Sequence, residues 1–300
     1  MNQQTPPAAA LAVGSWCWHA AYYAGQWSLL DLPAGAARLG LYQVELNDFM
    51  LPPPRHSRLR RPLLHALGAP PELWRYSRAT LGQLQARLAA ANVRPIAWSI
   101  HSDLTHTGPA GWWQSLYWRQ ALAATQQLDI PILCLTLGGQ QDSPTTTDTL
   151  VAHRLAALVR RSQAARPGLH IVVENHWGLS SDIPRLLAIL TQAQDLLPAG
   201  LRPQLGLCFD PGNLPAAKRT THWPALAHLA RHFHFKSYAF DAAGRETSLP
   251  YDQIFALLNQ AGYRGYVVVE YEGEGDPGRA IRHSLALYHT HAPPAASASK

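Results

Sequence analysis

The strongest constraint on the fold is a regular alternation of short apolar runs with longer amphipathic stretches. Eight apolar runs have the length and composition of buried strands: Leu11–Trp16, Tyr42–Leu46, Pro95–Ile100, Ile132–Leu137, Leu169–Glu174, Gln204–Phe209, His232–Lys236 and Tyr266–Glu270. Between them, apolar residues recur at helical spacing. These stretches are Leu32–Arg38, Leu81–Ala91, Trp112–Gln127, Asp148–Ala165, Ile183–Asp195, Trp223–Ala230, Tyr251–Ala261 and Arg279–Tyr288. The order predicts an α/β protein with a parallel sheet closed into a (β/α)8 TIM barrel.

A doubly wound open sheet is the alternative, but the Gly-x-Gly-x-x-Gly turn that would favour it does not follow the first strand. The 300 residues allow one large domain or two small ones, and 47% hydrophobic with 15% charged residues excludes a disordered chain. We therefore predict one barrel over residues 11–291, a flexible N-terminus over 1–10 and a disordered tail over 292–300.

Charge and cysteine content narrow the function only a little. The net charge of +6 rests mainly on arginine and does not by itself indicate a partner. Cys17, Cys134 and Cys208 form no C-x-x-C pair and cannot build a disulfide framework. The start lacks the charged region of a secretory signal, and no run approaches the roughly 20 apolar residues of a membrane span. A cytoplasmic protein is expected.

The segment Asn47–Ser77 is rich in Pro and Arg and is longer than an ordinary βα loop. We expect it to lie over one mouth of the barrel as a partial lid. Its arginines are consistent either with the binding of an anion or with a solvated basic loop.

Polar residues stand at the ends of the predicted strands, where barrel enzymes carry their working groups. They are Glu45, His101, Glu174, Asp210, His234 and Glu270. Because strand side chains alternate between faces, Glu174, Asp210, His234 and Glu270 are expected to project into the barrel mouth. One carboxylate alone could cap a helix, and one histidine could belong to the core. Three carboxylates and an imidazole together would repel one another without a cation, so they predict a divalent metal site. Oxygen-rich ligands favour Mn²⁺ or Mg²⁺, with Co²⁺ or Zn²⁺ also accepted.

These residues carry a resemblance to a known family. The segments ENHWG, FDPGN, HFHFK and VVVEYEG, with an early LYQVEL, resemble the sugar phosphate isomerase/epimerase group of the xylose isomerase-like barrels. That group is related to ketose 3-epimerases, inosose dehydratase and endonuclease IV. The resemblance implies metal ligation by Glu174, Asp210, His234 and Glu270, and it matches Asn213, His176 and Lys236 to positions near the metal.

One stretch departs from the family pattern. The text after Lys236 is SYAFDAAGRETSLPYDQI, without the Asp and Pro-x-Gly-x-Gly run of many members. Phe240 stands nearest to the substrate-gripping arginine of the ketose epimerases, and Arg245 is the candidate replacement. The departure leaves the substrate open.

The expected activity is isomerisation or epimerisation of a ketose or related keto-sugar through an enediolate, with Glu174 and Glu270 moving the proton. The first βα loop is rich in aromatic residues, which suit the C–H faces of a sugar. The candidate substrate contacts are Trp16, Glu45, His101, His176, Asn213, Lys236 and Arg245.

Three other functions remain as alternatives. A metal-dependent lyase or dehydratase of a keto-sugar or inosose would need the same metal and base. An endonuclease IV-like enzyme draws support from the pI of about 9.4, but the Asp-x-His pair expected after the seventh strand is missing. A non-catalytic barrel would be expected to have lost a ligand. We expect a small carbohydrate as partner, neither nucleic acid nor membrane, and leave a homo-oligomer open.

Overall fold

The computed structural model describes residues 10–53 and 68–291 of the chain. Its eight parallel strands pair in sequence order and close into a barrel, because β1 pairs with both β2 and β8. The strands are β1 (Ala10–Gly14), β2 (Gln43–Asn47), β3 (Arg94–Ile100), β4 (Ile132–Leu135), β5 (His170–Glu174), β6 (Leu205–Phe209), β7 (Ala230–Ser237) and β8 (Tyr266–Tyr271). The predicted TIM barrel is confirmed.

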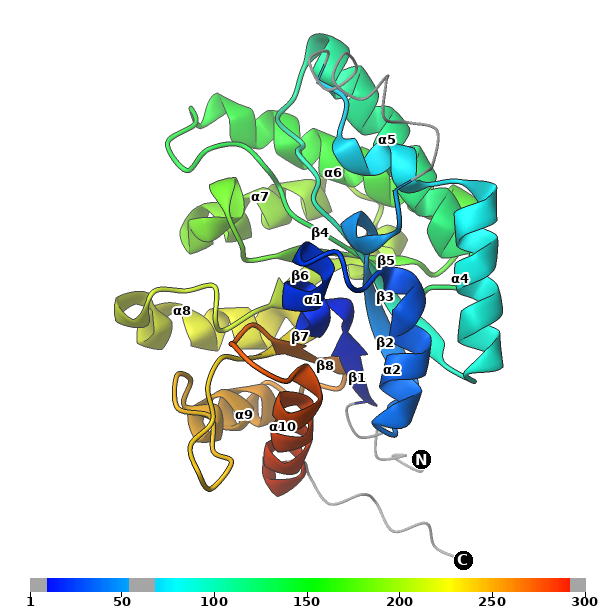
Figure 1. The fold of residues 1–300 in the computed structure, drawn as a ribbon. Helices are drawn as coiled ribbons and strands as arrows, with labels where there is room; N and C mark the ends of the chain where they lie inside the picture. Colours follow the sequence, from blue (N-terminus) through cyan, green and yellow to red (C-terminus); the bar gives the residue numbers. More distant parts are fainter. Residues whose placement is uncertain (1–9, 54–67, 292–300) are drawn as a thin grey trace, which may run out of the picture.

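Helices surround the barrel (Figure 1). They are α1 (His19–Tyr23), α2 (Leu32–Arg38), α4 (Arg78–Ala90), α5 (Gly108–Gln127), α6 (Thr146–Ala165), α7 (Ile183–Asp195), α8 (Ala216–Leu229), α9 (Tyr251–Gln260) and α10 (Pro277–His291). The short α1 was not predicted, and α8 begins at Ala216 rather than at Trp223, with Pro224 inside it. In the described part of the chain no helix is both long and apolar enough to cross a membrane.

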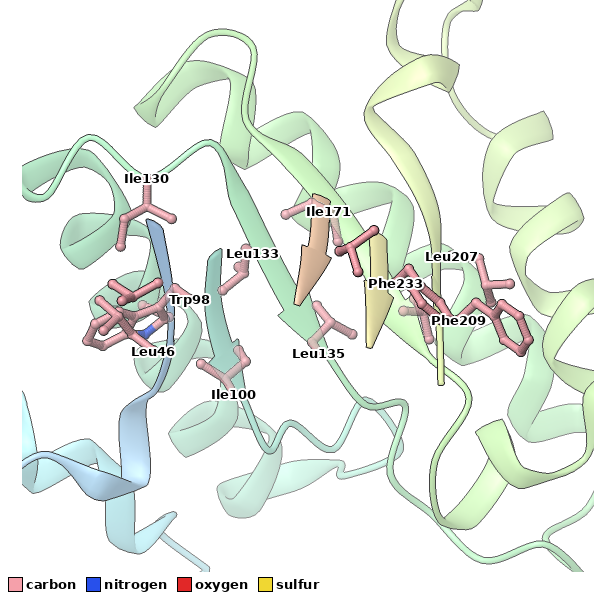
Figure 2. Packing of buried hydrophobic residues seen from close by; sticks show 14 of the residues in the cluster. Leu46, Trp98, Ile100, Ile130, Leu133, Leu135, Ile171, Leu207, Phe209 and Phe233 are labelled. Atoms are coloured by element: carbon pink, nitrogen blue, oxygen red, sulfur yellow. The ribbon is translucent and has the colours of Figure 1, made fainter. Parts of the chain in front are cut away.

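Side-chain alternation along the strands separates two cores. The outward face packs against the helices and holds Trp98, Leu133, Ile171, Phe209 and Phe233, among others (Figure 2). Each buried Leu, Ile or Phe contributes about 1.5–3 kcal/mol, so this layer stabilises the barrel. The inward face is narrow and carries mainly small residues: Ala12, Ile96, Ala97, Ile132, Cys134, Val172, Cys208 and Val268.

Local signals fix individual helix starts. The Asp182 side chain accepts a hydrogen bond from the backbone N–H of Arg185 at 3.2 Å and caps α7, whose second residue is Pro184. Ser77 caps α4 by accepting from the N–H of Thr80 at 3.0 Å. These caps satisfy orphan N–H groups at the points where loops turn into helices.

Some predicted segments lie outside the described residues. They are the tail 292–300, residues 1–9 of the predicted N-terminal segment, and residues 54–67 of the predicted lid. Ala10, which the prediction placed in the flexible segment, is the first residue of β1. The described flanks of the predicted lid form two 3₁₀ turns, η3 (Asp48–Met50) and η4 (Pro71–Arg75).

Candidate metal centre and active site

Four side chains meet at the carboxyl end of the barrel. Glu174 is the last residue of β5 and Asp210 directly follows β6, while His234 and Glu270 lie in β7 and β8. In the register of β7 and β8, Lys236 pairs with Glu270. His234 is two residues before Lys236 and therefore shares its interior face. Strand alternation thus directs all four side chains into the barrel mouth.

The imidazole of His234 is the common neighbour of the three carboxylates. Its Nδ1 lies 3.3 Å from Oε1 of Glu174, 3.6 Å from Oε2 of Glu270 and 3.7 Å from Oδ2 of Asp210. Ligands of one octahedral ion at about 2.1 Å are about 3 Å from one another. The side chains are therefore spaced almost as they would be around a single cation.

Two buried atoms of this cluster have no hydrogen-bond partner among the described residues, although one of them, Oδ2 of Asp210, forms an ion pair with Lys236 at 3.1 Å. They are Oδ2 of Asp210 and Nδ1 of His234. The other oxygen of Asp210, Oδ1, accepts from the N–H groups of Gly212 at 2.7 Å and Asn213 at 3.2 Å, which turns Oδ2 towards the cluster. Buried polar atoms are rarely left unpaired. The pair fits the donor set of a divalent ion, together with the oxygens of Glu174 and Glu270.

Lys236 already supplies one positive charge to the cluster. Its ammonium lies 2.8 Å from Oε2 of Glu270, 3.1 Å from Oδ2 of Asp210 and 3.2 Å from Oε2 of Glu272. Burial alone would lower the pKa of Lys236, but the charges of Asp210 and Glu270 raise it well above its ordinary value. Burial acts to raise the pKa of Asp210, yet the charge of Lys236 lowers it to about 2. The site holds charged groups out of water, and its carboxylates favour the binding of cations.

The two glutamates differ in electrostatic environment. Burial raises the pKa of Glu270, although the charges of His234 and Lys236 act against it. For Glu174 burial acts in the same direction, but the charges of His176 and His234 lower its pKa overall. Asn213 donates a 2.9 Å hydrogen bond from Nδ2 to Oε1 of Glu174.

Glu45 lies beneath the site rather than in it. The prediction placed it among the substrate contacts, but its side chain has no exposed surface. β2 continues to Asn47, so Asn47 occupies the interior position at the mouth and Glu45 lies one layer deeper. Its carboxylate accepts hydrogen bonds from His232 Nε2 at 2.5 Å, from His234 Nε2 at 3.1 Å and from the Ser99 hydroxyl.

The contact with Glu45 fixes which nitrogen of His234 faces the cluster. Burial alone would raise the pKa of Glu45, but the charges of His234 and His232 lower it well below its ordinary value, so the group is a carboxylate and can only accept. Nε2 of His234 must therefore donate, which leaves Nδ1 to face Glu174, Asp210 and Glu270. A carboxylate behind a metal-binding histidine commonly plays this role.

A cavity of about 290 Å³ opens above the cluster. It is lined by Trp16, Asn47, His101, Glu174, His176, His234, Lys236, Glu270 and Glu272. Phe49 stacks on His101 with ring centroids 5.2 Å apart and meets Trp16 edge-on at 6.0 Å. The acids and Lys236 thus form one part of the wall, and aromatic rings form another.

Four of the seven predicted substrate contacts line this cavity, namely Trp16, His101, His176 and Lys236. Glu45 and Asn213 do not line it, and neither does Arg245. Its guanidinium pairs with Asp241 at 2.8 Å and its side chain is 78% exposed. The reason is local, since Asp241 also accepts from the Arg245 N–H within a small turn closed by the Phe240–Glu246 bridge. A larger hollow, of about 610 Å³, lies between the loops after β7 and β8 and contains none of the four clustered side chains.

Sequence reasoning missed two residues of the cavity wall, Asn47 and Glu272. Each stands two positions after a residue that was identified, Glu45 and Glu270. The period-two rule that selected those residues also places their successors on the same face. The predicted strand around Glu45 ended at Leu46, one residue before Asn47, whereas Glu272 lies just beyond the observed end of β8 at Tyr271.

Comparison with known proteins agrees with this architecture. The profile of the xylose isomerase-like TIM barrel family matches residues 35–291. The chain belongs to that family. The match includes seven of the eight strands and all four clustered side chains, so the predicted family is confirmed.

Several solved structures superpose over nearly the whole chain at low identity. An L-ribulose 3-epimerase gives a TM-score of 0.66 at 16% identity, covering 94% of each chain. A 3-keto-D-glucoside 4-epimerase from E. coli gives 0.64 at 13% identity, covering 94% of this chain and 99% of its own. A probable 3-DHS dehydratase from Bacillus anthracis gives 0.64 at 13% identity, covering 93% and 98%.

Two curated relatives match over short segments. The alpha subunit of a C-glycoside deglycosidase from Microbacterium trichothecenolyticum is 35% identical over 74 residues, 24% of this chain and 20% of the relative. The alpha subunit of a 3'-dehydrocarminate deglycosidase from Microbacterium sp is 38% identical over 56 residues, 19% of this chain and 16% of the relative. The matched part thus spans a fifth or less of either relative.

Proposed function

We propose that this xylose isomerase-like barrel is a divalent-metal-dependent isomerase or epimerase that removes a proton from the carbon next to a carbonyl of a keto-sugar. The observation that carries the proposal is the convergence of Glu174, Asp210 and Glu270 on Nδ1 of His234, beneath an aromatic-walled cavity.

Glu174, Asp210, His234 and Glu270 would hold the ion, with Mn²⁺ or Mg²⁺ favoured by the oxygen-rich set. A bound divalent ion supplies Lewis-acid stabilisation of the negative charge that develops on the substrate's carbonyl oxygen. Asp210 and His234 serve to position it. Two backbone N–H groups hold the Asp210 side chain in place, and Glu45 holds that of His234. Neither side chain can therefore move to transfer a proton.

Glu174 and Glu270 are the groups proposed to move the proton. Each uses one oxygen in a contact with protein, Oε1 of Glu174 with Asn213 and Oε2 of Glu270 with Lys236. Among the described residues no hydrogen bond engages the second oxygen of either group, and both side chains line the cavity. One glutamate takes the proton from carbon, the C–H electron pair passes into the enediolate, and the proton on the other glutamate is delivered to the opposite face.

The cavity wall supports a sugar as substrate. Trp16 presents an aromatic surface to the C–H face of a sugar, while Asn47, His101 and His176 offer polar atoms to hydroxyl groups. Lys236 is engaged by three carboxylates and provides the only ammonium in the described wall. The epimerases with similar folds act, by their names, on ribulose and on a keto-glucoside.

A lyase is the second candidate function. A probable dehydratase has a similar fold, and the short-segment relatives are named deglycosidases. Both reactions fit a mechanism that begins with proton abstraction beside a carbonyl. Loss of a group from the next carbon then follows. The cluster around His234 serves either outcome.

The test combines metal analysis of the purified protein with incubation in deuterated water. The panel contains free ketoses, inososes and keto-glucosides that carry a methyl, phenyl or second glucosyl group. Deuterium incorporated next to the carbonyl supports the proposal, and loss of a hydroxyl or aglycone selects the lyase. A protein that binds no divalent ion and catalyses no exchange would contradict it. Nicking of abasic DNA would favour the nuclease alternative.

A further inference from the structure

A second cleft adjoins the cavity. It has a volume of about 270 Å³ and lies between the segment Gly68–Glu72, the loop after β3 and Trp177. His101 lines both the cleft and the cavity of about 290 Å³. Ligand sites in proteins usually measure about 300–1,000 Å³. Each space alone lies below that range, and the two together fall within it.

The lining of the cleft indicates what it would bind. Trp177 is 39% exposed although it is a large apolar side chain, and it follows His176 of the cavity wall. Gln114 is only 5% exposed, and its Oε1 has no hydrogen-bond partner among the described residues. An aromatic face with a buried acceptor suits a flat ring that carries a donor such as a hydroxyl group.

Charge in the cleft disfavours an anion. Glu72 and Asp103 both line it, and Nε2 of His106 lies 3.7 Å from Oδ2 of Asp103. No arginine or lysine of the described residues contributes to the lining. A phosphate or carboxylate would be repelled by the carboxylate of Asp103, whereas a neutral hydroxylated ring would not.

The cleft is built from firmly held backbone. The carbonyls of Gly138 and Gly139 approach Gly178 so closely that a Cβ there would lie 2.4 Å and 2.6 Å from them, and φ of Gly178 is +64°. Glycine is thus required next to Trp177. Asp103 accepts from the N–H of Thr105 at 2.8 Å and from that of Gly139 at 3.2 Å. The backbone of Gly138 and Gly139 thus contacts both Asp103 and Gly178, the residue after Trp177.

We propose that the cleft is a subsite for a second, neutral ring, and that the substrate is therefore a glycoside of a keto-sugar rather than a free ketose. The inference rests on the proposed function for the reacting sugar, which occupies the cavity above His234. The attached ring, a sugar or a phenol, passes His101 and lies on Trp177 with a hydroxyl on Gln114.

The first experiment compares kcat/KM for solvent exchange among the methyl, phenyl and glucosyl keto-glucosides. We expect the glucosyl substrate to exceed the methyl compound by about five- to tenfold, the range of one stacked ring with its hydrogen bond. The phenyl substrate, which stacks but carries no hydroxyl for Gln114, should exceed the methyl compound by a smaller factor, about two- to fivefold. The phenyl and glucosyl arms distinguish an aryl aglycone from a second sugar.

Two variants and one control locate the effect. Trp177→Ala is expected to reduce the preference for both ring-bearing substrates to about twofold or less. Gln114→Leu is expected to reduce the preference for the glucosyl substrate, whose ring carries hydroxyl groups, and to leave the preference for the phenyl substrate unchanged. Trp112→Ala removes an exposed tryptophan of α5 that does not line the cleft, and the preference should survive it. Thermal melts establish that each variant is folded, and Gln114→Leu tests the subsite independently if Trp177→Ala is not.

The outcomes separate this inference from the proposed function. Exchange at equal rates with all three substrates overturns the subsite and leaves the isomerase intact. If no substrate exchanges, the proposed function fails, and the subsite is then judged by saturation-transfer NMR with unoxidised phenyl β-glucoside. A phenyl signal seen with the wild type and lost in Trp177→Ala supports the subsite, and its absence from the wild type overturns it.

Discussion

The two halves of the barrel use carboxylates in opposite ways. In the half formed by β5–β8, Glu174, Asp210 and Glu270 converge on one nitrogen of His234 and leave polar atoms unpaired towards a cavity. In the half formed by β1–β4, Glu45 and Asp48 have no exposed surface and accept hydrogen bonds from protein groups, although Oδ1 of Asp48 has no hydrogen-bond partner among the described residues.

Asp48 shows the contrast most clearly. Its Oδ2 accepts from the hydroxyl groups of Tyr117 at 2.6 Å and Tyr76 at 2.7 Å, and the Tyr76 oxygen in turn accepts from Trp98 Nε1 at 2.8 Å. This network ties η3 to α5, to the segment after η4 and to β3. The same residue type that gathers charge for chemistry in one half therefore holds loops together in the other.

The comparison predicts that removing a carboxylate from the second half abolishes activity without unfolding the protein. Glu270→Gln keeps the shape but cannot take a proton, and we expect exchange with the best substrate to fall by about 10²–10⁴-fold. Deuterium incorporation measures this. Glu274→Gln, an exposed change in the same loop, is the control. Retention of more than a tenth of the activity in Glu270→Gln would remove that residue from proton transfer.

In the first half, the corresponding change should appear in stability and its pH dependence. Burial, with the nearby charge of Glu72, raises the pKa of Asp48 from 3.8 to about 7. The folded state thus binds this proton more tightly than the unfolded state, so its contribution to stability is present below pH 4 and is lost as the pH rises to 7. A shift of about three units corresponds to about 4 kcal/mol.

Urea unfolding from pH 5 to 8 tests this effect. Relative to Asp48→Asn, the wild type should lose stability across that range. Asp129→Asn, a change at an exposed carboxylate, should follow the wild type. Parallel curves for wild type and Asp48→Asn would show that Asp48 does not titrate there.

Glu45 connects the two halves of the barrel, because it belongs to β2 but contacts His234 of β7. Glu45→Gln weakens the hydrogen bond that orients His234, and loss of such a supporting contact typically costs about 10–100-fold in metal affinity. Calorimetric titration with Mn²⁺ measures it. If the variant binds Mn²⁺ with unchanged affinity and only its stability differs from that of the wild type, Glu45 has a purely structural role.

The smallest effect is expected at the aromatic wall. Trp16→Ala should raise KM by about three- to tenfold through lost contact with the sugar, with little change in kcat, and Trp16→Phe should recover most of the affinity. Steady-state kinetics separate the two constants. A fall in kcat as large as that of Glu270→Gln would break the division between a reactive half and a binding half.

The fold was predictable because each strand carries its own local signal. All eight predicted strands overlap the observed ones, and parity alone directed Glu174, Asp210, His234 and Glu270 to one mouth. The depth of Glu45 within the barrel was harder to predict from the sequence, because it depends on how far β2 continues past Glu45. Arg245 could not be placed from its spacing, since a turn with Asp241 decides where its side chain points.

The cleft beside His101 also lay beyond sequence reasoning. Its walls come from α5, from the loops after β3 and β5, and from Gly68–Glu72, and no local pattern announces that these meet. Gly178, which follows Trp177, lies so close to the Gly138 carbonyl that no side chain fits there. Such contacts between distant segments require the closed barrel.

The eight residues of β7 have a consequence for how this protein can change. His232, His234 and Lys236 alternate with Phe233 and Phe235, which pack outward against the helices. Deleting or inserting a single residue within the strand would exchange the two sets, placing phenyl rings in the barrel and three polar groups against the helices. Length variation among descendants of this chain should therefore be confined to loops, and β7 should admit neither an insertion nor a deletion.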